Sequence, residues 1–210
     1  WKLAGVFAGS LVIVIVGVID DLYALRPEKK LIGQIAAALV LVLCGIRFDF
    51  LNDVIGDREI ISSLVTIVWV IAMTNALNFL DNMDGLCAGV SAIAALSFFA
   101  CVLPSSQTFL CVLLMVFAGA VCGFLYHNFS PARTFMGAAG AMFCGYILAT
   151  VAVLGTFYTA EATPSRIALI APVLALSVPI FDTISVVFIR WRNGESIMKG
   201  DKRHFSHRLV

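Results

Sequence analysis

Carboxylates occur in this chain at spacings that could bind a divalent cation. Asp20 and Asp21 are adjacent at the end of an apolar run, and Lys30 and Gln34 follow them. The carboxyl end of a helix carries a partial negative charge, so two acids there need compensation. A divalent cation or a nearby lysine would supply it. The alternative is a solvated helix end whose lysines anchor the chain at a membrane surface.

A second polar group, the acid–amide row, recurs every three residues and consists of Asn75, Asn78, Asp81 and Asp84. Residues three apart lie on adjoining faces of a helix, so the row winds round one side of a helix end. Amide and carboxylate oxygens suit a polar ligand and Mg²⁺. At membrane depth such groups are costly unless they face a polar cavity. The alternative is a polar loop that merely leaves the membrane.

A third group joins Asn128 to the glycine-rich stretch 137–140. A glycine-rich helix start can offer backbone N–H groups to a phosphate. Small residues there could equally allow close packing between helices. The sequence leaves both interpretations open.

Near the end of the chain, residues 200–209 contain His204, His207 and Arg208 among further cations. Such a cluster suits a pyrophosphate or a sugar nucleotide, and the alternative is a basic patch attracted to anionic lipid. A zinc site has little support because no third ligand is nearby. Asp182 is a separate candidate, since an acid inside an apolar span is functional by default. It could support the site or bond to a neighbouring helix.

The elements that must position these residues are membrane spans. Hydrophobic residues make up 61% of the 210 residues and charged residues only 13%, whereas soluble domains have about 45–50% and 25%. Such a chain has too little polar surface for water, and its solvent is a lipid bilayer. The net charge of +1 argues against a nucleic-acid partner. The six cysteines form no CxxC pair and are typical of core residues.

Seven apolar runs are long enough to cross a bilayer, which predicts an all-α polytopic integral membrane protein with about seven transmembrane helices. The runs are residues 3–19, 31–47, 60–78, 87–104, 108–126, 136–157 and 166–189. Alternating loops place ten of the fourteen lysines and arginines on one side, together with the candidate site residues. The excess of positive charge predicts that this side is cytoplasmic.

The polar groups, in this order, resemble the polyprenyl-phosphate N-acetylhexosamine-1-phosphate transferases. The matching elements are GVIDDLYALRP with KKLIGQ, TNALNFLDNMDGLCAGVS, NFSPARTFMGAAG, VPIFDT and GDKRHFSHRL. The resemblance covers nearly the whole chain, and it implies one transmembrane catalytic domain over residues 1–210. The family's first spans have no counterpart here, which suggests a fragment of a longer bundle. The short His loop is similar to the branch that uses GlcNAc-1-phosphate rather than the muramyl-pentapeptide nucleotide.

The resemblance assigns roles by position. Asp20 and Asp21 match an aspartate pair near the lipid phosphate and Mg²⁺, and the acid–amide row matches the NxxNxxDxxDG loop at the nucleotide and metal site. Asp20, Asp21 and Asp81 are therefore candidate metal ligands, and together with Asp84 they are the candidate catalytic residues. The candidate substrate-binding residues are Lys30, Asn75, Asn78, Asn128, His204, His207 and Arg208.

The implied reaction transfers N-acetylhexosamine 1-phosphate, in particular GlcNAc-1-phosphate, from a UDP-sugar to undecaprenyl phosphate with release of UMP. The implied cofactor is Mg²⁺, with Mn²⁺ as an alternative. The expected partners are a UDP-N-acetylhexosamine, a polyprenyl phosphate and the lipid bilayer, with a second copy of the chain as a further candidate. The expected location is the bacterial inner membrane, with the active face cytoplasmic.

One motif departs from the family. Where the family reads FMGDxGS, this chain has Ala138 in place of the acid and Ala141 in place of the serine. In the family that acid is a principal Mg²⁺ ligand, so the resemblance implies impaired activity here. Because the other motifs are intact, we interpret the change as deliberate or recent. The rival hypotheses are an inactive homologue that binds lipid phosphate or sugar nucleotide, and a transporter, which the gathering of acids at one face disfavours.

Overall fold

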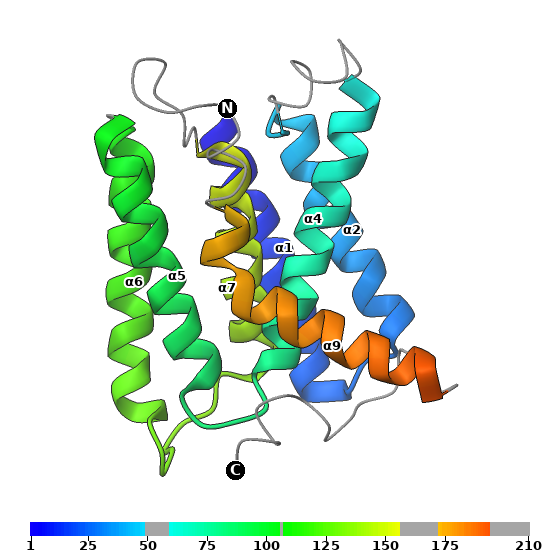
Figure 1. Cartoon of the computed structure of the whole chain (residues 1–210). Helices are drawn as coiled ribbons and strands as arrows, with labels where there is room; N and C mark the ends of the chain where they lie inside the picture. The colour runs from blue at the N-terminus through cyan, green and yellow to red at the C-terminus, as the bar shows by residue number, and fades with distance from the viewer. Residues whose placement is uncertain (49–58, 106, 156–171, 194–210) are drawn as a thin grey trace.

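The computed structural model describes residues 1–48, 59–105, 107–155 and 172–193, and within these ranges it is helical with no strand. Short turns join most of the helices (Figure 1). The long helices are α1 (Lys2–Tyr23), α2 (Pro27–Leu43), α4 (Glu59–Leu80), α5 (Leu86–Val102), α6 (Thr108–Asn128), α7 (Gly137–Leu154) and α9 (Ser177–Asn193), and a 3₁₀ turn, η1 (Leu103–Ser105), follows α5. Each of the seven predicted apolar runs overlaps one of these helices.

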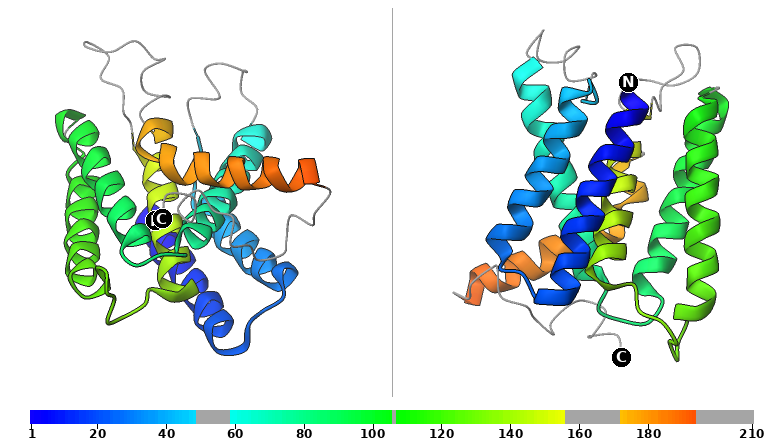
Figure 2. Two further views of the ribbon diagram at one scale, coloured as in Figure 1. Left: turned by 60° about the horizontal axis from the view of Figure 1, so that its bottom comes forward. Right: turned by 180° about the vertical axis from the view of Figure 1, so that it is seen from behind.

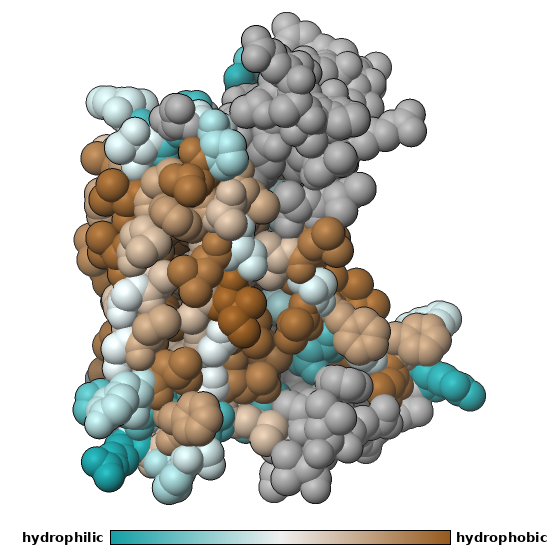
Figure 3. All heavy atoms as spheres, turned by 60° about the vertical axis from the view of Figure 1, so that its left-hand side comes forward, coloured by the Kyte–Doolittle hydropathy of each residue, from teal (hydrophilic) through white to brown (hydrophobic). Residues whose placement is uncertain are grey.

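Five of the helices are long and apolar enough to cross a bilayer, namely α1, α4, α5 with η1, α6 and α7. The helices α2 and α9, with 17 residues each, are shorter. Large apolar side chains such as Leu11 and Val116 are more than half exposed, and hydrophobic residues cover most of the described surface between the polar ends in Figure 3. The chain is therefore a multi-pass α-helical membrane protein, as the sequence predicted.

Six helices run side by side with alternating direction, and α9 crosses them obliquely against α4 (Figures 1 and 2). At one end of the bundle α1, α4 and α6 end, and α2, α5 and α7 begin; we call it the polar end. The connections 24–26, 81–85 and 129–136 lie at this end. The oblique α9 differs from the regular span predicted over 166–189, because apolar composition sets the solvent of a helix but not its tilt.

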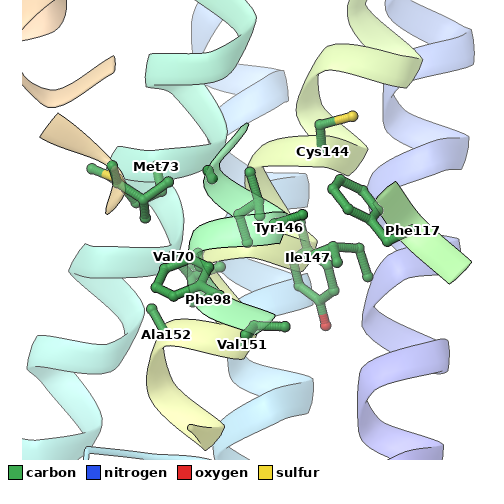
Figure 4. Packing of buried hydrophobic residues seen from close by; sticks show 14 of the residues in the cluster. Val70, Met73, Phe98, Phe117, Cys144, Tyr146, Ile147, Val151 and Ala152 are labelled. Carbon is green, nitrogen blue, oxygen red and sulfur yellow. The ribbon is translucent and has the colours of Figure 1, made fainter. Parts of the chain in front are cut away.

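Helix α7 lies at the centre of the packing, between α1 and α4 and against α5. Its side chains Ile147 and Val151 are buried in a core that also contains Val70 of α4, Phe98 of α5 and Phe117 of α6 (Figure 4). Association of helices within a membrane depends on such close packing, because lipid is as apolar as the side chains. The central α7 therefore sets the spacing of its neighbours.

Candidate functional site

The turn between α1 and α2 is built around Asp20. Ala24 ends α1 in the left-handed conformation, and Pro27 occupies the first position of α2, where its fixed φ suits a helix start. One carboxylate oxygen of the buried Asp20 lies 2.6 Å from Lys30 Nζ. The other accepts the Leu25 N–H at 2.9 Å. The acid at this helix end is thus compensated by a lysine, one of the two solutions that the sequence predicted.

Asp21, the next residue, bonds to a different helix. Its two carboxylate oxygens accept the backbone N–H groups of Ala138 at 2.7 Å and Ala139 at 3.1 Å. These amides belong to the first turn of α7, which begins at Gly137 with a φ of +67°. The first N–H groups of a helix have no partner within it and carry its partial positive charge. The glycine-rich start of α7 therefore does hold an anion, here a carboxylate; a phosphate there remains a prediction.

Asp81 follows α4 directly and is the third acid at this place. The pKa of its carboxyl is raised to about 6, chiefly by burial and then by the nearby charge of Asp21, while a hydrogen bond from the Gly137 backbone acts to lower it. The ends of α1 and α4 therefore bring two mutually repelling carboxylates to the start of α7. A cation between two such groups would favour their ionised forms.

The first amide of the acid–amide row is used inside the protein. Asn75 and the buried Gln34 exchange two hydrogen bonds of 2.7 and 3.1 Å, and Asn75 also donates to the Ile71 carbonyl at 2.8 Å. This pair joins α2 to α4. Asn78, one turn further along α4, is half-buried and has no hydrogen-bond partner within the described part of the chain. Of the two amides, Asn78 is the one available to a ligand.

Asp84 and Asn128 fix the loop that leads into α7. The buried Asn128 accepts the Gly85 N–H at 3.0 Å and donates to the Thr134 carbonyl at 2.8 Å. Asp84 accepts the Ala132 N–H at 3.0 Å. These bonds join the start of α5, the end of α6 and the loop 129–136. Both side chains therefore contact the backbone that positions α7.

Asp182 and the residues of the His-rich stretch are the remaining candidates. Asp182 is buried, with 3% of its surface exposed, in the oblique helix α9. His204, His207 and Arg208 fall outside the described residues. Sequence reasoning missed Gly17, whose place against α7 is described below. Its position four residues before Asp21, on the same face of α1, could have indicated a role in positioning that acid.

Positions 138 and 141, where the sequence differs from the family motif, have different surroundings. Ala138 lies in the first turn of α7, where its own N–H bonds to Asp21. Ala141 is fully buried against Leu77, Leu80 and Cys87 in an apolar cluster. An acid at 138 would arise beside two carboxylates, whereas a hydroxyl at 141 would face apolar side chains. No group of three or more His, Cys, Asp or Glu residues that could hold a metal occurs in the described ranges.

Comparison of the amino-acid sequence with known proteins shows the family of the chain. Residues 3–156, which include all of α1 except its first residue and extend through α7, match the family model described as glycosyl transferase family 4. The chain belongs to glycosyl transferase family 4.

Two relatives of this family 4 chain match it along nearly its whole length, and a third matches about three fifths of it. A probable undecaprenyl-phosphate N-acetylglucosaminyl 1-phosphate transferase of Bacillus subtilis is 30% identical over 100% of the chain and 58% of its own length. A decaprenyl-phosphate N-acetylglucosaminephosphotransferase of Mycolicibacterium smegmatis is 36% identical, over 99% and 56%. A phospho-N-acetylmuramoyl-pentapeptide-transferase of Desulforudis audaxviator is 34% identical over 62% of the chain and 43% of its own length. The chain thus spans little more than half the length of the Bacillus and Mycolicibacterium relatives.

Proposed function

We propose that this chain is the core of an enzyme that transfers GlcNAc-1-phosphate from UDP-GlcNAc to undecaprenyl phosphate and releases UMP. The observation that carries the proposal is the meeting of Asp21 and Asp81 with the start of α7 at the polar end of the bundle. The names of the Bacillus and Mycolicibacterium relatives supply the sugar phosphate and the class of lipid acceptor. The product would begin a lipid-linked glycan of the cell envelope.

The donor set fits Mg²⁺, with Mn²⁺ as an alternative. Mg²⁺ in phosphate sites takes one or two protein carboxylates and completes its shell with water and substrate oxygens. Asp21 and Asp81 would supply these ligands, whereas Asp20 already has its charge compensated by Lys30. Bound Mg²⁺ would neutralise charge on the pyrophosphate of the donor.

The chain's own residues would bind and orient two anionic substrates. An oxygen of the lipid phosphate attacks the β-phosphorus of the UDP-sugar, and the bond from that phosphorus to the bridging oxygen breaks, so that UMP leaves with the electron pair. Lys30, in the first turn of α2 at the polar end, would contact phosphate, and the half-buried Asn78 would bind the nucleotide sugar. His204, His207 and Arg208 would contact the same donor. Positioning and electrostatics account for most catalysis of phosphoryl transfer.

Alanine at position 138 bears on whether this chain is active. The alanines at positions 138 and 141 favour a second candidate function, an inactive homologue that binds lipid phosphate or sugar nucleotide. For both candidate functions the location would be the bacterial plasma membrane with the polar end in the cytoplasm, because the sequence predicts most lysines and arginines on that side.

The test is UMP release from UDP-GlcNAc with undecaprenyl phosphate and Mg²⁺ in detergent. We would compare the unsubstituted chain with Ala138→Asp and with Ala141→Ser, each extended by the N-terminal spans of a relative. We expect Ala138→Asp alone to restore release, since Ala141 faces an apolar cluster. Equal release by all three proteins would show that position 138 is not a metal ligand. Nucleotide binding without release in any of them would support the binding homologue.

A further inference from the structure

The contact between α1 and α7 is made by backbone at Gly17. A Cβ atom added there would lie 2.3 Å from the Cα of Ala139 and 2.8 Å from its nitrogen. Both atoms belong to the helical backbone of α7, which cannot turn aside as a flexible side chain can. Even an alanine at position 17 would therefore force the two helices apart.

The bond that Asp21 makes lies one helical turn beyond this contact. Residues four apart share a helix face, so Gly17 and Asp21 both face the first turn of α7. Gly137 leaves room for the carboxylate, because a Cβ on it would lie 2.8 Å from Asp21 Oδ2. The closeness of the helices at Gly17 is what allows the bonds of 2.7 and 3.1 Å from Ala138 and Ala139 to form.

The opposite side of α7 contacts α4 in the same way. A Cβ on Gly145 would lie 2.6 Å from the Met73 carbonyl oxygen and 2.7 Å from the Thr74 Cα. The helix α4 leads, at its polar end, to Asp81. Helix α7 thus fixes α1 on one side and α4 on the other, each by a contact that only glycine permits.

We propose that Gly17 is a positioning residue, whose missing side chain holds α1 against α7 so that the Asp21 carboxylate lies over the first turn of α7 and faces Asp81. Gly17 touches no substrate in this account and acts through Asp21. Its effect on transfer rests on the proposed function, whereas its effect on the first turn of α7 does not.

The test compares Gly17→Ala with Gly119→Ala, a control in α6 where an added Cβ meets nothing within 4 Å. Hydrogen–deuterium exchange would be followed in the peptide that covers the start of α7. We expect Gly17→Ala to speed exchange of these amides about tenfold or more and Gly119→Ala to leave it unchanged. In proteins that also carry Ala138→Asp, Gly17→Ala should lower kcat for UMP release about tenfold or more, with a smaller change in KM.

A second variant covers the case in which Gly17→Ala does not fold. Asp21→Ala keeps the helix contact but removes the carboxylate, so it should expose the same amides. Unchanged exchange in Gly17→Ala, or in Asp21→Ala, would overturn the positioning role. If Ala138→Asp releases no UMP, the proposed function fails, and the exchange measurement still decides the role of Gly17.

Discussion

Two parts of the bundle use small residues in opposite ways. In the unit formed by α1, α4 and α7, Gly17 and Gly145 lie where an added Cβ would meet backbone closer than 3 Å. In the α5–α6 hairpin, Gly89, Gly119 and Gly123 have nothing within 4 Å of such an atom. The unit with the close contacts is the one that brings Asp21 and Asp81 together. Close backbone contact at glycine therefore occurs between the helices that position the two acids and not within the α5–α6 hairpin.

The polar ends of the two parts differ as well. In the α1–α4–α7 unit, carboxylates face one another, and Asp21 raises the pKa of Asp81. At the hairpin, Asp84 and Asn128 are bonded to backbone groups of the loop before α7. The carboxylates of Asp21 and Asp81 can therefore interact with a ligand. Asp84 and Asn128 instead hold the loop before α7 in place.

The largest effect expected from this contrast is on activity. In protein that carries Ala138→Asp, Asp81→Asn should lower UMP release about 100-fold or more, because even indirect partners of a metal ligand are worth about 10–100-fold. Asp84→Asn should have a smaller effect, since its bond to the Ala132 N–H can be replaced by the amide oxygen. A steady-state assay of UMP release would compare the two variants. A greater loss in Asp84→Asn would contradict the assignment of Asp81 as the metal ligand and of Asp84 as a structural residue.

Next in size is the effect of one methyl group on stability. Gly145→Ala should destabilise the bundle by about 1–3 kcal/mol, the usual cost of overpacking. Gly123→Ala should be neutral or stabilising by up to about 1 kcal/mol, because alanine favours a helix. Thermal unfolding in one detergent would compare them. Equal stability of the two variants would mean that α4 and α7 are not in backbone contact.

The smallest contrast concerns two asparagines. Asn128→Ala leaves the Gly85 N–H and the Thr134 carbonyl without their partner and should cost about 1–2 kcal/mol. Asn78→Ala should leave stability unchanged and raise KM for the nucleotide sugar in protein that carries Ala138→Asp. Thermal unfolding and steady-state kinetics on the same preparations would measure both effects. A loss of stability in Asn78→Ala but not in Asn128→Ala would contradict the structural role of Asn128 and the ligand-binding role of Asn78.

Much of the fold could be predicted, because continuous apolar runs determine where a chain crosses a bilayer. The predicted run 60–78 became α4 (Glu59–Leu80), and the run 108–126 became α6 (Thr108–Asn128). The oblique course of α9 could not be predicted, since its direction depends on packing against α4 and not on its composition.

The site was predicted in its residue types but not in its bonds. Spacing in the sequence pointed to Asp21 and Asp81, and the structure brings both to the start of α7. The spacing could not reveal that Asn75 pairs with Gln34, 41 residues away, because the packing of the helices determines such partners. Nor could it show that Ala141 faces an apolar cluster while Ala138 adjoins the acids.

We propose that α1, α4 and α7 together form a divalent-cation site that an acid at position 138 completes. Mn²⁺ binding, followed by electron paramagnetic resonance without substrates, tests it most directly. Ala138→Asp should bind Mn²⁺ about tenfold or more tightly than the unsubstituted chain, and adding Asp81→Asn should abolish the gain. Equal affinity in the three proteins would contradict the claim that these helix ends share one metal site.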